Sequence, residues 1–209
     1  MGYRELDLTN YPRRAHFAYF RTLAYPYAGL TANVDITAFT ARRKEKGCPF
    51  FLTFTYCVTR AANAVPAFRQ RIRGDGIVEY DWCPGSVTLA EPDGTFCFCT
   101  LSCRENFSDY LPAAEEAKRR ALEANRLDGE TDEEPLLFLS SVPWVSFTQV
   151  VHPAPCPADS NPRILWGKIF TQEGRTLIPV SVLCNHALCD GRHMADFYAA
   201  LDRELASVF

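Results

Sequence analysis

No stretch of this 209-residue sequence is apolar over the roughly 18 to 20 residues that a membrane-spanning helix requires. A secretory signal is also missing, because the N-terminus carries Arg4, Glu5 and Asp7 where such a signal has an apolar middle. With neither segment present, we expect a soluble, cytoplasmic protein without a membrane partner.

A surplus of positive charge is absent as well. Lys and Arg number 22 against 25 Asp and Glu, which gives a formal net charge of −3. The Arg residues are scattered, and the short basic run at 42–44 is followed by Glu45, which is typical of a solvated helix face. Nucleic-acid binding requires a clustered basic surface, so we expect no nucleic-acid partner.

Metal-binding patterns are missing among the nine Cys and four His. No Cys-x-x-Cys occurs, and no His flanks a Cys pair at zinc-site spacing. Four Cys lie in apolar runs, where a reduced thiol behaves as a small hydrophobic side chain: Cys57, Cys97, Cys99 and Cys184. A metal site at Cys97, Cys99 and Cys103 is the alternative, but we expect buried thiols and no metal.

What the sequence does contain is ample material for a core. Hydrophobic residues make up 47% of the chain and aromatic residues 13%, with no internal repeat and no Gly/Ser-rich linker. We therefore expect residues 1–209 to form a single domain.

The apolar pattern predicts helices interleaved with strands. Residues 95–103 alternate with the period of a strand, and residues 194–208 place an apolar stripe at helical spacing. Helices are expected at 35–46, 51–63, 112–126 and 194–208. Strands are expected at 76–80, 86–90, 95–103, 136–139, 145–150, 164–172 and 175–183, with an acidic surface loop at 128–135. This order predicts an α/β fold, a two-layer sandwich of a mixed β-sheet and packed helices.

Residues 180–193 carry the clearest chemical pattern. A buried apolar strand ends at His186, Asp190 and Gly191 follow, and then the last helix starts. A general base needs an imidazole in a fixed position, which the end of a rigid strand provides. Gly191 would permit a backbone turn closed to other residues. Since His-x-x-x-Asp-Gly also recurs by chance, a non-catalytic His186 is the alternative.

Three separated motifs resemble those of the chloramphenicol acetyltransferases, in the same order along the chain. The stretch from His186 to His193 is similar to that family's His-Ala-x-x-Asp-Gly-aromatic-His. Residues 11–17, which include Arg13, resemble its aromatic-x-Arg-Lys-x-His-Phe, and residues 140–144 resemble its Ser-x-x-Pro-Trp. Shorter matches extend the resemblance over nearly the whole chain. The resemblance implies the CoA-dependent acyltransferase fold.

The resemblance also implies a reaction, the transfer of an acetyl group from the co-substrate acetyl-CoA to a hydroxyl. His186 would take the hydroxyl proton as general base, and Ser140 would donate a hydrogen bond to the oxyanion of the tetrahedral intermediate. No covalent acyl-enzyme is needed, so no Cys has to act as a nucleophile. In the family, the Asp at the position of Asp190 pairs with the Arg at the position of Arg13 and holds the backbone of the site. This ion pair supplies the cation without which a buried carboxylate would be very costly.

Other motif positions have two interpretations each. Trp144 lines the CoA channel or belongs to the core, and Lys168 meets the CoA phosphates or is a surface strand lysine. His16 and His193 are expected to be buried structural histidines, and His152 a loop residue.

The chain departs from the family's pattern near the expected site. Asn185 replaces the first His of a usual pair, Arg192 replaces an aromatic residue, and Leu165 stands where many members have Thr.

The expected acceptor pocket differs further. Phe20 takes the place of a Tyr, and Ala24 and Ala28 occupy positions where larger apolar side chains are common. One methylene changes binding by only about 1 to 3 kcal/mol, but several changes together can alter the acceptor.

Three functions therefore remain open. The first is a chloramphenicol O-acetyltransferase that modifies the 3-hydroxyl and confers antibiotic resistance. The second keeps the mechanism but serves another hydroxyl acceptor, and the third is a relative that binds CoA or a small molecule without turnover. The acyltransferase domains of 2-oxo acid dehydrogenase complexes share the His motif, but they carry Asp-His-Arg where this chain has Asn-His-Ala. The resemblance finally implies a homotrimer with active sites at the subunit interfaces.

Overall fold

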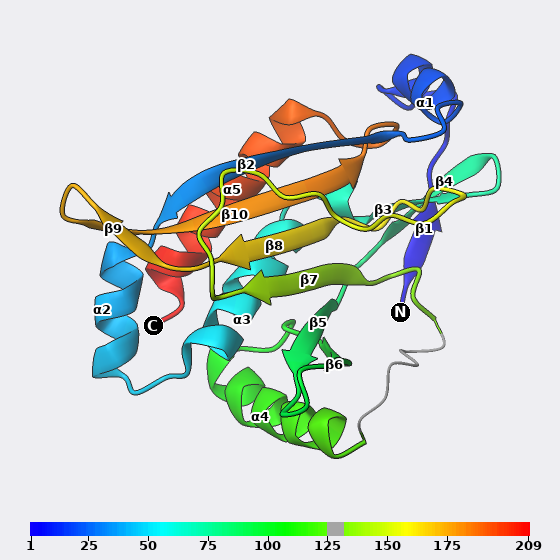
Figure 1. The fold of residues 1–209 in the computed structure, drawn as a ribbon. Coiled ribbons are helices and arrows are strands. Elements are labelled where there is room, and N and C mark those ends of the chain that lie inside the picture. The colour runs from blue at the N-terminus through cyan, green and yellow to red at the C-terminus, as the bar shows by residue number, and fades with distance from the viewer. Residues whose placement is uncertain (125–131) are drawn as a thin grey trace.

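A computed structural model describes residues 1–124 and 132–209 (Figure 1). Ten strands occur among these residues: β1 (Tyr3–Glu5), β2 (Tyr27–Asp35), β3 (Gln70–Arg73), β4 (Gly76–Tyr80), β5 (Gly85–Ala90), β6 (Phe96–Leu101), β7 (Leu137–Val142), β8 (Arg163–Gly167), β9 (Phe170–Gln172) and β10 (Arg175–Asn185). The helices are α1 (Arg14–Phe20), α2 (Thr37–Glu45), α3 (Phe50–Asn63), the short 3-10 helix η1 (Pro66–Arg69), α4 (Phe107–Ala124) and α5 (Gly191–Ser207).

The main sheet has seven strands and mixes both strand directions. Its order is β2-β10-β8-β7-β5-β6, and β9 pairs with β10 beside this path. β7 runs parallel to β5 and β8, whereas the other neighbours are antiparallel. A smaller antiparallel sheet of order β1-β4-β3 lies beside it.

The two faces of the main sheet are covered differently. Helices α3 and α5 pack against each other and lie behind the sheet in Figure 1, while the irregular segment 143–162 crosses its front. α3 is buried nearly all round, including Thr53, Thr55 and Thr59, as the apolar run at 51–63 predicts. The prediction of two layers, a mixed sheet and packed helices, is confirmed.

Several predicted bounds are wrong for identifiable reasons. Helix α4 begins at Phe107 rather than Pro112, because its first turn buries Tyr110 against α3 and that burial outweighs the amide that Pro112 lacks. The strand expected at 164–172 is broken into β8 and β9, since the amide of Lys168 donates to the carbonyl of Val145 outside the ladder.

The strand expected at 145–150 is absent; this stretch belongs to the irregular segment in front of the sheet. Gly191 does not have the backbone that only glycine adopts, and an added Cβ would meet no atom within 4 Å. The predicted acidic loop at 128–135 lies partly outside the described residues.

The thiols predicted to be buried are buried, Cys57 and Cys97 most completely. Burial raises the pKa of the Cys57 thiol well above its ordinary value. Within 1–124 and 132–209, no group of three or more His, Cys, Asp or Glu side chains comes together as a metal site. None of the helices in these two ranges is long and apolar enough to span a bilayer.

Candidate functional site

The imidazole of His186 sits directly after strand β10, in a turn that fixes both its backbone and its ring. Its amide donates to the carbonyl of Pro26 (2.7 Å), and its Nδ1 lies 2.6 Å from the carbonyl oxygen of Cys189. A carbonyl can only accept, so Nδ1 carries the proton. In the neutral ring, Nε2 is therefore the nitrogen with a lone pair for a substrate proton.

Part of the expected acceptor pocket lies against this ring. Phe20, at the end of α1, packs on the imidazole with ring centroids 3.9 Å apart. Ala28 is half-buried in β2, where it pairs with Cys184, the residue two positions before His186. Ala24 is exposed on the connection between α1 and β2. The side chain of Phe20 thus restricts rotation of the imidazole.

Arg13 and Asp190 form an ion pair beneath the His186 turn. Arg13 is only 14% exposed, and its second guanidinium nitrogen donates to the carbonyl of His186 (3.1 Å). Asp190 is also the N-cap of α5, where it accepts from the amide of Arg192 and contacts His193 at 2.9 Å. Partial burial works against the charged carboxylate, but Arg13 and His193 hold the pKa of Asp190 below its usual range.

Asn185 gives the turn a further anchor in place of the family's first His. Its side chain is buried, accepts from the amide of Ala187 (3.0 Å) and donates to the carbonyl of Asp159 (2.8 Å). The carboxylate of Asp159 in turn holds Arg163 of β8 through two hydrogen bonds of 2.8 and 2.7 Å. The replacement at Asn185 therefore leaves no buried polar atom of that amide without a partner.

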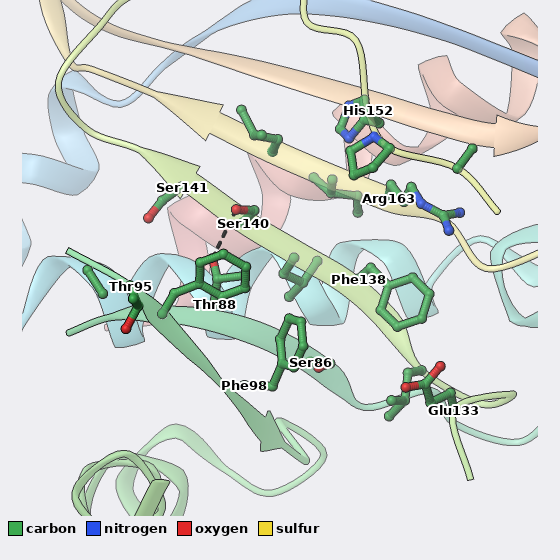
Figure 2. Close-up of a pocket in the computed structure, with 18 of the residues that line it drawn as sticks. Ser86, Thr88, Thr95, Phe98, Glu133, Phe138, Ser140, Ser141, His152 and Arg163 are labelled. Carbon is green, nitrogen blue, oxygen red and sulfur yellow. Dashed lines mark hydrogen bonds between the residues drawn. The ribbon is translucent and has the colours of Figure 1, made fainter. Parts of the chain in front are cut away.

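Ser140 lies elsewhere, in a cavity of about 990 Å³ between the front of the sheet and the segment 143–162 (Figure 2). Its hydroxyl is 2.9 Å from that of Thr88 on β5. Apolar side chains make up much of the wall, among them Phe96, Phe98, Phe138, Leu165 and Trp144. The volume suits a small-molecule ligand.

The two residues expected to meet CoA lie in different surroundings. Trp144 lines the cavity but is 73% exposed, so the alternative of a core tryptophan is wrong. Lys168 is exposed between β8 and β9 and does not line the cavity. Leu165 does line it, in register with Ser140 on one side and Ser181 on the other. Arg192 lies outside on α5, where it pairs with Asp196.

The structure does not bring His186 and Ser140 together within one chain. Ser140, Leu165 and Ser181 are neighbours across β7, β8 and β10, and His186 lies five residues beyond Ser181. Two strand spacings and five residues of strand put the two side chains roughly 20 Å apart. A single chain therefore presents the imidazole and the hydroxyl at two separate places, the His186 turn and the Ser140 cavity.

The histidines outside the His186 turn differ from expectation in two cases. His16 is exposed, so its predicted burial is wrong, whereas His193 is half-buried and caps α5. His152 was expected only as a loop residue, and it does lie in the segment 143–162. It is also buried and lines the Ser140 cavity (Figure 2). No local pattern signals this, because its contact Ser181 is 29 residues away.

Comparisons with known proteins agree over nearly the whole chain. The profile of the family described as chloramphenicol acetyltransferase matches residues 1–202. Chloramphenicol acetyltransferase 2 of Escherichia coli is 32% identical over 205 residues, 96% of each chain. The Haemophilus influenzae protein of the same name is 31% identical over 206 residues, again 96% of each.

A solved structure supports the same assignment. It is named chloramphenicol acetyltransferase, superposes with a TM-score of 0.85 at 27% identity, and covers 98% of this chain and 100% of its own. The fold is thus shared over nearly the full length of both chains. The chain has the CoA-dependent acyltransferase fold, belongs to the chloramphenicol acetyltransferase family and is an acyltransferase.

Proposed function

We propose that residues 1–209 form one catalytic domain that transfers the acetyl group of acetyl-CoA to the 3-hydroxyl of chloramphenicol, with His186 as general base. The observation that carries this proposal is the 2.6 Å contact between Nδ1 of His186 and the Cys189 carbonyl. It commits one ring nitrogen to the protein and leaves Nε2 for the substrate. Because acetyl-CoA is a cytoplasmic metabolite, the same proposal places the protein in the cytoplasm, where it would confer resistance to the drug.

The proposed chemistry is a direct transfer. Nε2 of His186 takes the proton from the hydroxyl as its oxygen attacks the acetyl carbon, which gives a tetrahedral intermediate with a negatively charged oxygen. Ser140 donates a hydrogen bond to that oxygen, and Thr88, 2.9 Å away, orients the serine hydroxyl. When the intermediate collapses, the C–S bond breaks and the CoA thiolate takes the proton from the imidazolium.

Asp190 and Arg13 position this base rather than take part in proton transfer. Asp190 does not contact the His186 ring in the way of a triad acid, since Nδ1 is occupied by the Cys189 carbonyl. Its charge instead holds Arg13, which binds the His186 backbone. The ion pair thereby fixes where Nε2 is presented.

We further propose that the active site forms between chains of a homotrimer. With His186 and Ser140 roughly 20 Å apart in one protomer, the reaction needs the imidazole of one copy to face the cavity of its neighbour. The His186 turn and the Ser140 cavity would then be two half-sites of one active site. Both have exposed apolar side chains nearby that such an interface would cover: Tyr19, Leu23 and Tyr25 near His186, and Phe96, Phe98 and Trp144 at the cavity. A cyclic trimer joins two unlike surfaces of this kind three times.

For the CoA moiety we propose that Trp144 flanks the channel and that Lys168 contacts a phosphate. Trp144 is at the cavity wall and largely exposed, as a residue that becomes covered by ligand would be. Lys168 is exposed, and its ammonium group is available to an anion.

A second candidate is the same transfer to a different hydroxyl compound. The cavity has Leu165 where the family pattern has a hydroxyl side chain, and Ala24 and Ala28 are small. These changes alter the surroundings of the acceptor but leave His186, Ser140 and the Arg13–Asp190 pair in place.

The test is CoA release, followed with a thiol reagent in the presence of acetyl-CoA and chloramphenicol. We expect release by the wild type, a decrease of about 10² to 10⁴ in His186→Ala, and no decrease in the matched control His16→Ala, whose imidazole is exposed. Release with other alcohols but not with chloramphenicol would support the second candidate. Binding of CoA without release to any acceptor would contradict acetyl transfer and indicate a silent relative.

A further inference from the structure

We infer that His152 is a specificity-determining residue, which hydrogen-bonds a polar group at the far end of the acceptor from the hydroxyl that is acetylated. The inference rests on the proposed function, because it concerns the ligand of the Ser140 cavity. The imidazole comes from the segment 143–162, which covers the front of the sheet (Figure 2).

A contact with Ser181 of strand β10 anchors the His152 ring. His152 is 8% exposed, and its Nε2 lies 3.2 Å from the hydroxyl of Ser181. Ser181 is itself buried in β10, which lies between β2 and β8. The ring is therefore held at a defined place although its backbone belongs to an irregular segment.

The second ring nitrogen is available to a ligand. Within 1–124 and 132–209, no side chain or backbone group makes a hydrogen bond to Nδ1 of His152. The residue lines the cavity, so this nitrogen is the part of the ring that remains for a bound molecule. A serine hydroxyl both donates and accepts, so the tautomer can adjust and Nδ1 can donate or accept as the ligand requires.

The electrostatic surroundings keep this imidazole neutral. Burial and then the nearby charge of Arg163 lower the pKa of His152 to about 4. Asp159 holds the Arg163 guanidinium in place by an ion pair of 2.7 Å. An imidazole with so low a pKa is a weak base at pH 7, but it remains a good hydrogen-bonding group.

The strand register gives the distance at which the acceptor must carry its polar group. Ser140 and Ser181 are opposite the same residue, Leu165, from its two sides. Two strand spacings place the His152 contact on the order of 10 Å from Ser140, where the reacting carbonyl would sit. Leu165 lies between them, and Phe138 belongs to the same cavity wall. The ligand class is thus an elongated, mostly apolar alcohol with a hydrogen-bonding substituent about 10 Å from its reactive hydroxyl.

The variants His152→Leu and His152→Gln test this assignment with chloramphenicol as acceptor. Loss of one hydrogen bond in an apolar cavity predicts a roughly three- to tenfold higher KM for the acceptor in His152→Leu, with kcat and the KM for acetyl-CoA nearly unchanged. His152→Gln keeps a polar group and is expected to recover part of the loss. Ser181→Ala, which removes only the anchor of the ring, is expected to give a smaller increase.

Several outcomes would overturn the assignment. An unchanged or lower acceptor KM in His152→Leu would show that the imidazole does not bind the acceptor. An effect confined to the KM for acetyl-CoA would place it against the other substrate, and equal effects of Leu and Gln would indicate a packing role. Thermal unfolding of each variant shows whether the fold is intact. Failure of the proposed function is distinct, because the wild type itself would then acetylate nothing.

Discussion

The two half-sites of this protein are built in different ways. The His186 turn is a contiguous stretch, held by Arg13, Asn185 and its own backbone within a few residues of a central strand. The Ser140 cavity is assembled from four strands and a long irregular segment, and most of its wall is apolar. Polar contacts to one short turn thus position the imidazole proposed as base, whereas apolar side chains from several strands shape the proposed acceptor site.

Mixing two inactive variants provides the strongest test of this division. His186→Ala and Ser140→Ala are each expected to lose at least about 10² in kcat. If the half-sites meet between copies of a cyclic trimer, co-expression in equal amounts combines an intact imidazole with an intact hydroxyl at about a quarter of the interfaces. Activity of the mixture should therefore rise to roughly that fraction of the wild-type value.

The matched control mixes His186→Ala with the double variant that also carries Ser140→Ala. No interface of that mixture contains an intact imidazole, so no activity should return. If the first mixture stays as inactive as its components, while a trimer of both chains is detected, the half-sites do not combine across subunits.

The substitution Asp190→Asn tests whether the ion pair with Arg13 holds the His186 turn in place. Asn remains a good N-cap for α5 but removes the charge that pairs with Arg13. We expect kcat to fall by about 10- to 100-fold through misplacement of His186, with an unchanged pH-rate profile. Asp196→Asn is the control, because its carboxylate pairs with the exposed Arg192 and such surface pairs contribute little. Full activity of Asp190→Asn would contradict the positioning role.

The buried His152 in the wall of the Ser140 cavity should make the stability of the fold sensitive to acid. The pKa of His152 is about 4 in the folded chain, against its ordinary value near 6.5 after unfolding. Between these values the unfolded chain binds the extra proton, so this contribution to stability is complete above pH 6.5 and is lost as the pH falls towards 4. The loss of unfolding free energy is roughly 2 to 3 kcal/mol at pH 4.5. Thermal unfolding at pH 7.5 and 4.5 should show a smaller decrease for His152→Leu than for the wild type; equal decreases would contradict a buried neutral imidazole.

The contrast also explains which parts could be predicted from the sequence. The His186 turn lies within fourteen residues, so its spacing is visible in the sequence. The sequence predicts the helix at 51–63 and the strand at 76–80 because apolar residues predominate in both stretches. The sequence does not predict the edge strand β2. Both of its faces are largely exposed in one chain, so its residues lack the alternation of apolar and polar side chains that marks a half-buried strand.

The cavity could not be predicted for a related reason. Segments separated by up to about eighty residues line it, and each of them alone has an ordinary loop or strand composition. The burial of His152 depends on where the segment 143–162 folds back onto β10, which propensity and periodicity do not determine. The pairing of Arg13 with Asp190 was implied by resemblance alone, because their 177-residue separation leaves no local signal.

The cysteines of this chain bear on the product of the reaction. Acetyl transfer liberates CoA as a free thiol, which can exchange with any protein disulfide or oxidised cysteine within reach. Burial raises the pKa values of Cys57, Cys103 and Cys184, so their thiolate fractions are very small. Cys156, which belongs to the segment 143–162, is exposed instead. An enzyme that produces a thiol at every turnover thus keeps these three of its own thiols chemically silent within its core.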